Sequence, residues 1–305
     1  MDKLKTLRIS KPRHFSLANT LKIIQRGKCD PINIINDGQL KRIISTPEGF
    51  SYVNIFETNN YINIKISCLK GRISNLVIKN EIHKILGLDD PLIHDEKTDF
   101  DCRKYNRIQR MKSASLPCYA SHYENLIQTI LGQQVSAIVA NRVRSDLIKK
   151  YGRKIKICDC YYYIFPNAEN MSKANVEDLR NIGMSLNKAK AIISISDRFC
   201  DKTWIQEITS ASKSSTDIIK MLTDVKGIGP WTASWFLIRG LRKFDFIPST
   251  DLIIRKAMSW WWGKPEILEA PKIDEIASKM GKHKGIISYR IMLAYMTDIM
   301  KQGIT

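Results

Sequence analysis

Alternation of hydrophobic and polar residues marks the first part of the chain. In YINIKISCL (61–69) the isoleucines alternate with polar residues, which is the period of a strand that buries one face. FSYVNIF (50–56) precedes this run and RISNLVI (72–78) follows it, with the short breaks ETNN and KG between them. These runs predict an antiparallel meander.

Two segments beside these runs have helical spacing and end at a glycine, SLANTLKIIQRG (16–27) and NEIHKILG (80–87). They are candidates for helices that cover the buried face of the sheet. The following segment, DDPLIHDEKTDFDCRKYNR (89–107), is polar and broken, and from Ser121 onward nearly every segment has helical spacing. We therefore expect a domain boundary near residues 105–115.

The rest of the chain predicts helices joined by short turns. SHYENLIQTIL (121–131) begins with a capping box of Ser121 and Glu124. SAIVANRVRSDLIKKYG (136–152) has a serine cap at its start and a glycine at its end. NVEDLRNIG, SLNKAKAIISISDRF and SSTDIIKMLTDV continue the pattern. The predicted fold class is α+β, with a β-rich N-terminal domain over residues 1–110 and an all-helical region over residues 111–305.

The composition is that of a globular protein with a basic surface. Hydrophobic residues make up 44% of the 305 residues, and no apolar run approaches the roughly 18 residues of a membrane span. The start, MDKLKTLRISKPRHF, lacks the apolar middle of a signal peptide, so we expect a cytoplasmic protein that is neither secreted nor membrane-bound. The net charge of +19 favours a polyanion as partner, although many lysine-rich surfaces bind nothing specific.

The cysteines favour reduced thiols over a disulfide framework, because the chain has seven of them and no export signal. Cys158 and Cys160 form the only close pair, and no second pair stands at metal-ligand spacing. We therefore expect neither a zinc site nor an iron–sulfur cluster.

The stretch VKGIGPW (225–231) places two glycines around one isoleucine, with a proline directly after them. Glycine adopts positive φ without a Cβ penalty, so GIG permits a narrow turn between two helices. Pro230 suits the first position of the second helix. The free amides at that helix start form an anion site that suits a phosphate. An ordinary corner between two helices, with glycine at a cap, is the alternative that the same spacing allows.

The longer stretch VKGIGPWTASWFLIRGLRKFDFIPSTDLIIRKA (225–257) resembles the helix-hairpin-helix (HhH-GPD) DNA glycosylase superfamily. The shared features are the glycine hairpin, the Pro-Trp-Thr-Ala start of the second helix, and an Asp 22 residues beyond Gly229. LIQTILGQQVS (126–136) and LRNIGMSLNKAKAI (179–192) extend the resemblance. The likeness is to the 3-methyladenine DNA glycosylase II branch, which implies a β-rich domain, two helical subdomains and a hairpin at 216–241.

The resemblance implies that Asp251 is the catalytic carboxylate. Such enzymes cut the bond between a damaged base and deoxyribose, and positive charge develops on the sugar. A carboxylate beside C1′ stabilises that charge and orients the attacking water. In IPSTDLIIRK, Ser249 or Thr250 is the expected helix cap, and Asp251 then lies in the first turn, where the helix dipole favours its ionised form. The alternative role for this Asp is helix stabilisation alone.

Three further residues match family positions that handle the flipped base. Trp231 and Trp235 match positions that line the base pocket, although core packing is the commoner role of tryptophans at helical spacing. Gln134 in GQQVS matches the residue that fills the gap left by the flipped base, and a plain polar loop residue is its alternative. Relatives that also cleave the DNA backbone carry a lysine where this chain has Trp231, so the resemblance implies a monofunctional glycosylase that uses water.

The resemblance also implies how the hairpin binds. The residues implied to contact the DNA backbone are Gly227, Ile228, Gly229 and Thr232. The implied ligands of a monovalent cation, K⁺ or Na⁺, are the backbone carbonyls of Thr223, Val225 and Ile228. This cation has no side-chain signature in the sequence.

One segment departs from the family pattern. Near the C-terminus the family has a Trp-Lys-Pro-aromatic-Arg-Ser run, whereas this chain has GKHKGIISYR (281–290), in which only Ser288 and Tyr289 match. An aromatic wall of the pocket is therefore expected to be missing. That loss puts the preference for cationic alkylated bases in doubt, because such bases stack on electron-rich rings. For the triple tryptophan at 260–262 we expect a packing role only.

The predicted function is excision of alkylated purines of the 3-methyladenine type from duplex DNA, by base flipping and Asp-assisted hydrolysis of the N-glycosidic bond in base excision repair. The expected partner is duplex DNA with a damaged base, bound by a monomer at the nucleoid. Two alternatives remain open: a related glycosylase for a deaminated or oxidised base, and a DNA-binding module without catalysis. Asp251 argues against the module, since DNA binding does not require it.

Overall fold

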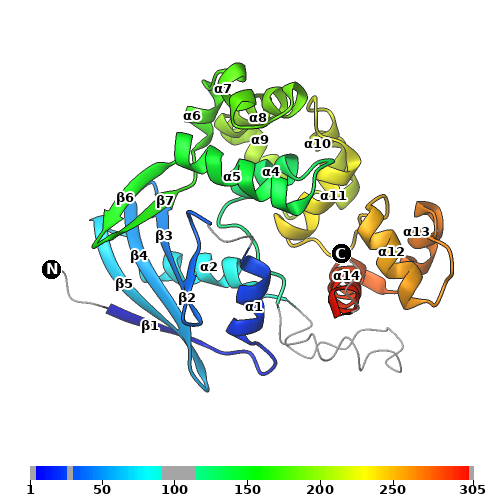
Figure 1. The fold of residues 1–305 in the computed structure, drawn as a ribbon, viewed down its shortest axis with the longest axis horizontal. Coiled ribbons are helices and arrows are strands. Elements are labelled where there is room, and N and C mark those ends of the chain that lie inside the picture. The colour runs from blue at the N-terminus through cyan, green and yellow to red at the C-terminus, as the bar shows by residue number, and fades with distance from the viewer. Residues whose placement is uncertain (1–4, 26–29, 91–114, 302–305) are drawn as a thin grey trace.

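The computed structural model describes residues 5–25, 30–90 and 115–301. Its N-terminal part is a five-stranded antiparallel sheet in the order β1-β5-β4-β3-β2 (Figure 1). The strands are β1 (Lys5–Ser10), β2 (Ile34–Asn36), β3 (Gln39–Thr46), β4 (Gly49–Glu57) and β5 (Tyr61–Gly71). The predicted meander is confirmed for β4 and β5, and three strands join it that the alternation did not single out.

The alternation along β5 decides which face of the sheet is buried. Its isoleucines Ile62, Ile64 and Ile66 are buried in one apolar cluster with residues of α1 (Leu17–Ile24) and α2 (Asn75–Leu86). The two predicted covering helices are therefore present and lie on the same face of the sheet. The first of them ends at Ile24, and the predicted glycine end at residue 27 lies outside the described residues.

The segment at 72–78 is not a strand, which corrects the sequence prediction. β5 ends at Gly71, whose φ is +66°, and Ser74 caps α2 by accepting a hydrogen bond from the Val77 amide at 3.2 Å. The helix therefore begins at Asn75, before its predicted start, and ends as predicted at Gly87 in the left-handed conformation. Here the serine cap outweighs the β-propensity of the isoleucine and valine residues nearby.

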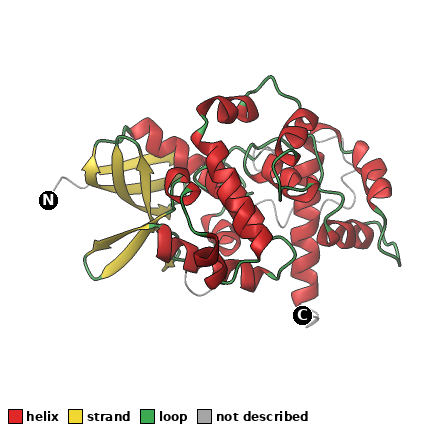
Figure 2. Cartoon of the chain, turned by 90° about the horizontal axis from the view of Figure 1, so that it is seen from above, coloured by secondary structure: helices red, strands yellow, loops and turns green. Residues whose placement is uncertain are grey.

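Helices make up most of the second part of the chain (Figure 2). They are α4 (His122–Leu131), α5 (Ala137–Tyr151), α6 (Ala168–Ser172), α7 (Val176–Asn181), α8 (Leu186–Cys200), α9 (Lys202–Thr209), α10 (Ser215–Thr223), α11 (Pro230–Arg239), α12 (Leu252–Trp261), α13 (Ala270–Ser278) and α14 (Lys284–Lys301). A sheet followed by helices confirms the predicted α+β class. The predicted boundary near residue 110 lies outside the described residues.

A two-stranded hairpin interrupts the helices, so the prediction of an all-helical second part was wrong at this point. Its strands are β6 (Arg153–Ile157) and β7 (Cys160–Ile164), which follow α5 directly. Tyr162 packs with Ile43 and Phe50 of the sheet, on the face opposite α1 and α2. The hairpin therefore covers the second face of the N-terminal sheet, and Figure 1 shows it reaching from the end of α5 over that sheet.

Two apolar clusters divide the helices, and α11 belongs to both. Phe236 and Leu237 point into the cluster that contains α4, α5, α8 and α10, whereas Trp235 and Ile238 point into the cluster of α12, α13 and α14. The tryptophans at 260–262 pack in the second cluster, in line with the expected packing role. The glycine turn before α11 and the start of α12 are thereby fixed at the junction of the two clusters.

A buried set of ion pairs joins the sheet to the helices. The backbone amide of Glu124 donates to Ser121 Oγ at 3.0 Å, but the Glu124 carboxylate binds Arg144 at 2.9 Å. Only one half of the predicted capping box is therefore formed. Arg144 also contacts Asp30 at 2.9 Å; burial raises the pKa of Asp30, but the nearby guanidinium outweighs that effect and lowers the pKa.

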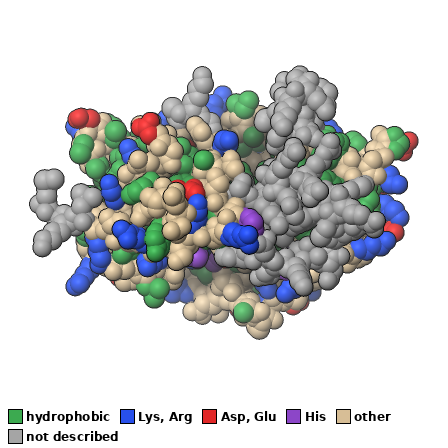
Figure 3. Space-filling model, turned by 90° about the horizontal axis from the view of Figure 1, so that it is seen from below, with side chains coloured by type: hydrophobic (Ala, Val, Ile, Leu, Met, Phe, Trp, Pro, Cys, Tyr) green, Lys and Arg blue, Asp and Glu red, His purple; other side chains and the backbone are tan. Residues whose placement is uncertain are grey.

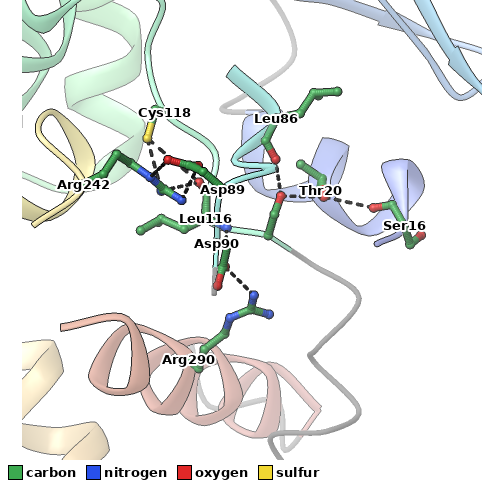
Figure 4. A network of polar contacts seen from close by, with 10 residues as sticks. Ser16, Thr20, Leu86, Asp89, Asp90, Leu116, Cys118, Arg242 and Arg290 are labelled. Carbon is green, nitrogen blue, oxygen red and sulfur yellow. Dashed lines mark hydrogen bonds and ion pairs between the residues drawn. The ribbon is translucent and has the colours of Figure 1, made fainter. Parts of the chain in front are cut away.

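A second polar network ties the end of α2 to the C-terminal helices (Figure 4). Asp90 accepts from Arg290 of α14 at 2.6 Å, and both side chains are fully buried. Next to it Asp89 pairs with Arg242, which also donates to the carbonyl of Leu116 at 2.9 Å. Breaking a buried pair by removing one partner leaves an uncompensated charge, so this network fixes the position of α14 strongly.

Candidate active site

Asp251 is itself the N-cap of α12, which corrects the predicted cap at Ser249 or Thr250. Its Oδ1 accepts the backbone amides of Ile253 at 2.8 Å and Ile254 at 3.0 Å. The side chain is 8% exposed. The helix start therefore holds one carboxylate oxygen with two amides and leaves the second oxygen for other partners.

The second oxygen of Asp251 accepts two indole N–H groups. Trp231 Nε1 donates to Oδ2 at 2.7 Å, and Trp235 Nε1 donates to the same oxygen at 3.0 Å. The carboxylate thus faces four donors, two on each oxygen. Hydrogen bonds to a carboxylate are stronger than those between neutral groups, so the four donors fix its position and orientation.

The two tryptophans differ in their surroundings. Trp235 is 5% exposed and packs edge-on against Tyr289, with ring centroids 6.4 Å apart and an interplanar angle of 81°. The guanidinium of Arg239 lies 4.6 Å from the Trp235 ring centroid and 5.5 Å from that of Tyr289. Trp235 is therefore held from several sides by packing, whereas Trp231 is only partly buried.

The C-terminal segment supplies an aromatic ring at this place despite its unusual sequence. Tyr289 is buried on α14, beside Trp235, and Ser288 closes a local hydrogen bond to the carbonyl of Gly285 at 2.9 Å. Because Tyr289 is buried, it packs against Trp235 and does not itself form an exposed wall of a pocket. The expected lack of an aromatic wall of the base pocket therefore remains a prediction.

The turn between α4 and α5 lies next to these rings. A Cβ placed on Gly132 would be 3.8 Å from the indole of Trp231. Gln134 follows in this turn with an exposed side chain and a φ of +52°, which only a few per cent of non-glycine residues adopt. The structure thus presents Gln134 outward, in a conformation that the turn imposes.

Gln133 was missed by the sequence analysis, although it stands beside Gln134. Its Nε2 donates to the carbonyl of Gly227 at 3.0 Å and to the hydroxyl of Thr232 at 2.8 Å. It therefore connects the α4–α5 turn to both ends of the glycine hairpin. A long amide next to the wedge position was the available signal, but its partners are distant in sequence.

Glycine is suited to the two hairpin positions for different physical reasons. Gly227 has a φ of +93°, and a Cβ there would approach the Cβ of Ala191 to 2.5 Å. Gly229 has open space around its would-be Cβ and caps α11 in an extended conformation. Gly227 therefore serves the fold of the hairpin, and Gly229 leaves room at the start of α11.

Two hairpin side chains point inward. Ile228 is buried in the apolar cluster, and Thr232 is buried with its hydroxyl bound to Gln133. Ile228 and Thr232 could therefore contact an external partner only through their backbone groups. The first amides of α11 are suited to this, because the first N–H groups of a helix lack partners within the helix.

The carbonyls named for a monovalent cation lie in one tight turn. The Val225 carbonyl accepts the amide of Ile228 at 3.0 Å, and Thr223 is the last residue of α10. A carbonyl oxygen has a second lone pair, so this hydrogen bond leaves Val225 able to bind a cation. A set of neutral carbonyls without a carboxylate fits a monovalent ion better than a divalent one.

Lys188 lies beside the α4–α5 turn and was also not singled out from sequence. Its Nζ donates to the carbonyl of Leu131, at the end of α4, at 3.0 Å. Partial burial lowers the pKa of this ammonium group. The contact places a positive charge at the C-terminal end of a helix, where it stabilises the last carbonyls.

Other chemistry is sparse in the described part of the chain. There, no three His, Cys, Asp or Glu side chains come together as a metal site would require. Cys158 and Cys160 are free and exposed at the turn of the β6–β7 hairpin. Among residues 5–25, 30–90 and 115–301, no helix has the length and apolar character needed to cross a bilayer.

Comparison with known proteins gives matches along most of the chain. The family described as "HhH-GPD superfamily base excision DNA repair protein" matches residues 127–283, just over half of the 305 residues. A DNA-3-methyladenine glycosylase of Bacillus subtilis (strain 168) is 24% identical in an alignment of 257 residues that covers 80% of this chain and 82% of that protein.

Solved structures share the whole architecture. A 3-methyladenine DNA-glycosylase from Archaeoglobus fulgidus superposes with a TM-score of 0.78 at 23% identity, over 95% of this chain and 98% of that one. An 8-oxoguanine glycosylase/lyase of Clostridium acetobutylicum, in complex with duplex DNA containing cytosine opposite 8-oxoguanine, superposes with a TM-score of 0.70 at 16% identity, over 97% and 98%. At these identities the likenesses establish the fold.

Proposed function

Because the chain belongs to the HhH-GPD superfamily of base excision DNA repair proteins, we propose that it is a DNA glycosylase that removes alkylated purines of the 3-methyladenine type from duplex DNA. The Bacillus subtilis relative, which matches four fifths of the chain, bears the name of this activity. The net charge of +19 suits a polyanionic substrate, and Lys and Arg side chains are spread over the face shown in Figure 3.

The carboxylate of Asp251 carries the proposal. Cleavage of the N-glycosidic bond leaves positive charge on the sugar, and a fixed negative charge beside C1′ stabilises it. The four donors around Asp251 hold the carboxylate in one orientation. A residue needed only as a helix cap would require the two backbone amides but not the two indoles.

Hydrolysis by water, without a covalent enzyme intermediate, follows from the residue at the start of α11. Trp231 occupies the position where relatives with lyase activity carry a lysine, and an indole cannot form an imine with the sugar. Trp231 instead donates to Asp251 at 2.7 Å. The proposed enzyme is therefore monofunctional, and the abasic strand it leaves stays intact.

The DNA contacts are proposed at the hairpin and at the α4–α5 turn. Gly229 and the amides at the start of α11 bind a phosphate, and the exposed Gln134 fills the gap left by the flipped base. The carbonyls of Thr223, Val225 and Ile228 would hold a K⁺ or Na⁺ ion that faces the same phosphate. Exchange of these ions for a bulky organic cation at equal ionic strength should then weaken DNA binding.

A panel of duplex oligonucleotides, each with one lesion, tests the activity. The panel contains an alkylated purine, a deaminated base and 8-oxoguanine, and each product is divided into samples with and without alkali. We expect release of the alkylated purine and strand cleavage only after alkali. Cleavage without alkali would refute the monofunctional mechanism, and release of another base alone would move the assignment to that lesion.

A further inference from the structure

The β6–β7 hairpin has one buried and one exposed face. On the buried face, Ile155 pairs with Tyr162 and packs toward the sheet. The exposed face is formed by the next two cross-strand pairs, Lys154 with Tyr163 and Lys156 with Tyr161, since directly opposite residues of an antiparallel pair share a face. We call these four residues, Lys154, Lys156, Tyr161 and Tyr163, the ribbon face.

The ribbon face combines positive charge with phenol groups. Lys154 and Lys156 are exposed, Tyr161 is 49% exposed, and Lys154 Nζ lies 3.9 Å from the Tyr161 ring centroid. Asp159 in the turn is the acidic residue at its tip. Lysine ammonium and tyrosine hydroxyl groups are both common donors to DNA phosphates.

Helix α5 connects this face to the candidate active site. The helix begins three residues after Gln134 and ends at Tyr151, with only Gly152 between it and β6. Its 15 residues span about 22 Å, which corresponds to roughly six or seven base pairs of B-form DNA. Arg142 and Lys149 are exposed along it. Exposed basic residues therefore continue from the active-site turn to the ribbon.

We propose that the ribbon face binds the phosphate backbone of duplex DNA on one side of the lesion, about six or more base pairs from the flipped base. This inference rests on the proposed function, because it takes lesion-containing duplex DNA as the substrate. The charge of the face argues for this occupant. The ribbon contributes affinity and footprint length, and it leaves recognition of the damaged base to the residues around Asp251.

The test varies the length of the duplex and the charge of the ribbon face. A duplex of about 10 base pairs with a central lesion ends before the ribbon, whereas one of about 30 base pairs reaches it. The variant Lys154→Ala/Lys156→Ala is compared with Lys22→Ala/Lys202→Ala, which removes two exposed charges from α1 and α9. Equilibrium affinity is measured across a salt series, and circular dichroism checks the fold of both variants.

For the long duplex, the ribbon variant should lose affinity and its slope of log K against log salt should become shallower by about 2, one unit per lost phosphate contact. For the short duplex, the two variants should bind alike. Equal binding of both variants to the long duplex would overturn the proposal, as would an equal loss on both duplex lengths. A loss confined to single-stranded oligonucleotides would also overturn it. Base release from the short duplex by the unaltered protein tests the proposed function separately.

Discussion

Trp231 Nε1 lies 2.7 Å from Asp251 Oδ2, so the tryptophan at the start of α11 binds the carboxylate at the start of α12. Sequence resemblance assigned the two residues separate roles, one in stacking and one in charge stabilisation. The hydrogen bond makes them one unit, in which the indole fixes the direction of the carboxylate.

Trp231→Phe separates these two roles, because it keeps an aromatic ring and removes the N–H donor. A hydrogen bond to a charged group contributes about 1.5–3 kcal/mol, so we expect base release to slow by about 10- to 100-fold. The affinity for lesion DNA should change little. Single-turnover kinetics and equilibrium binding measure the two effects, and Trp204→Phe on α9 is the matched control. Loss of affinity with an unchanged rate would indicate that Trp231 serves stacking alone.

Gly227→Ala should lower the stability of the protein, whereas Gly229→Val should weaken DNA binding. At Gly227 a methyl group would come 2.5 Å from Ala191 Cβ at a φ of +93°, so the free energy of unfolding should fall by roughly 1–3 kcal/mol. At Gly229 the space is open, so the valine variant should fold but bind all DNA sequences more weakly. Denaturant unfolding and binding to undamaged duplex distinguish them. Selective loss on one lesion for Gly229→Val would place the hairpin in the base pocket instead.

Gln133→Ala and Gln134→Ala form a second contrast between neighbours. Gln133 makes two hydrogen bonds to the hairpin, and its removal should lower the free energy of unfolding by about 1–3 kcal/mol. Gln134 is exposed, so its truncation should change stability by less than about 0.5 kcal/mol but slow base release from duplex DNA. Thermal unfolding and single-turnover rates test both. A stable Gln134→Ala protein with full activity would refute the wedge role.

Stability should fall in mildly acidic solution because of His122. Burial, with a smaller effect from Lys84, lowers the pKa of His122 below its ordinary value of 6.5, and its Nδ1 contacts the carbonyl of Gly240 at 2.9 Å. As the pH falls below about 6.5, the unfolded chain takes up a proton at this residue before the folded one does, so folding is disfavoured. In His122→Asn, the free energy of unfolding should depend less on pH between pH 5 and 7. An unchanged pH dependence in that variant would remove the assignment.

The local part of the fold was accessible from sequence, and the long-range part was not. Alternation gave β4 and β5, and the serine and glycine ends of α5 matched those observed. β1 was missed because its partner is β5, more than 50 residues away. The β6–β7 hairpin carries alternating isoleucines but has Cys158 and Asp159 at its turn in place of an Asn-Gly or Asp-Gly signal.

In the candidate active site, too, local features were accessible from sequence and long-range contacts were not. The family resemblance picked out Asp251 by its spacing from the glycine hairpin. Three residues in a row can cap this helix, and only the folded chain shows that Asp251 does so. The indole contacts to its second oxygen depend on how α11 and α12 pack. Gln133 was not identified from the sequence because its hydrogen-bond partners lie more than 90 residues away.

Base release by Asp251→Asn tests whether this carboxylate is catalytic. Asparagine keeps the helix cap through its carbonyl oxygen but turns an NH₂ group toward the two indole donors, so both the charge and two hydrogen bonds are lost. Loss of such a preorganised contact costs about 10²–10³ in rate, roughly 3–4 kcal/mol.

The measurement is the single-turnover rate on an alkylated duplex, taken on the same preparation as the DNA affinity and a thermal unfolding curve. We expect a folded protein that binds lesion DNA within a few-fold of the unaltered chain and releases the base at least a hundredfold more slowly. A folded Asp251→Asn protein with full activity would contradict it and leave Asp251 as a helix cap.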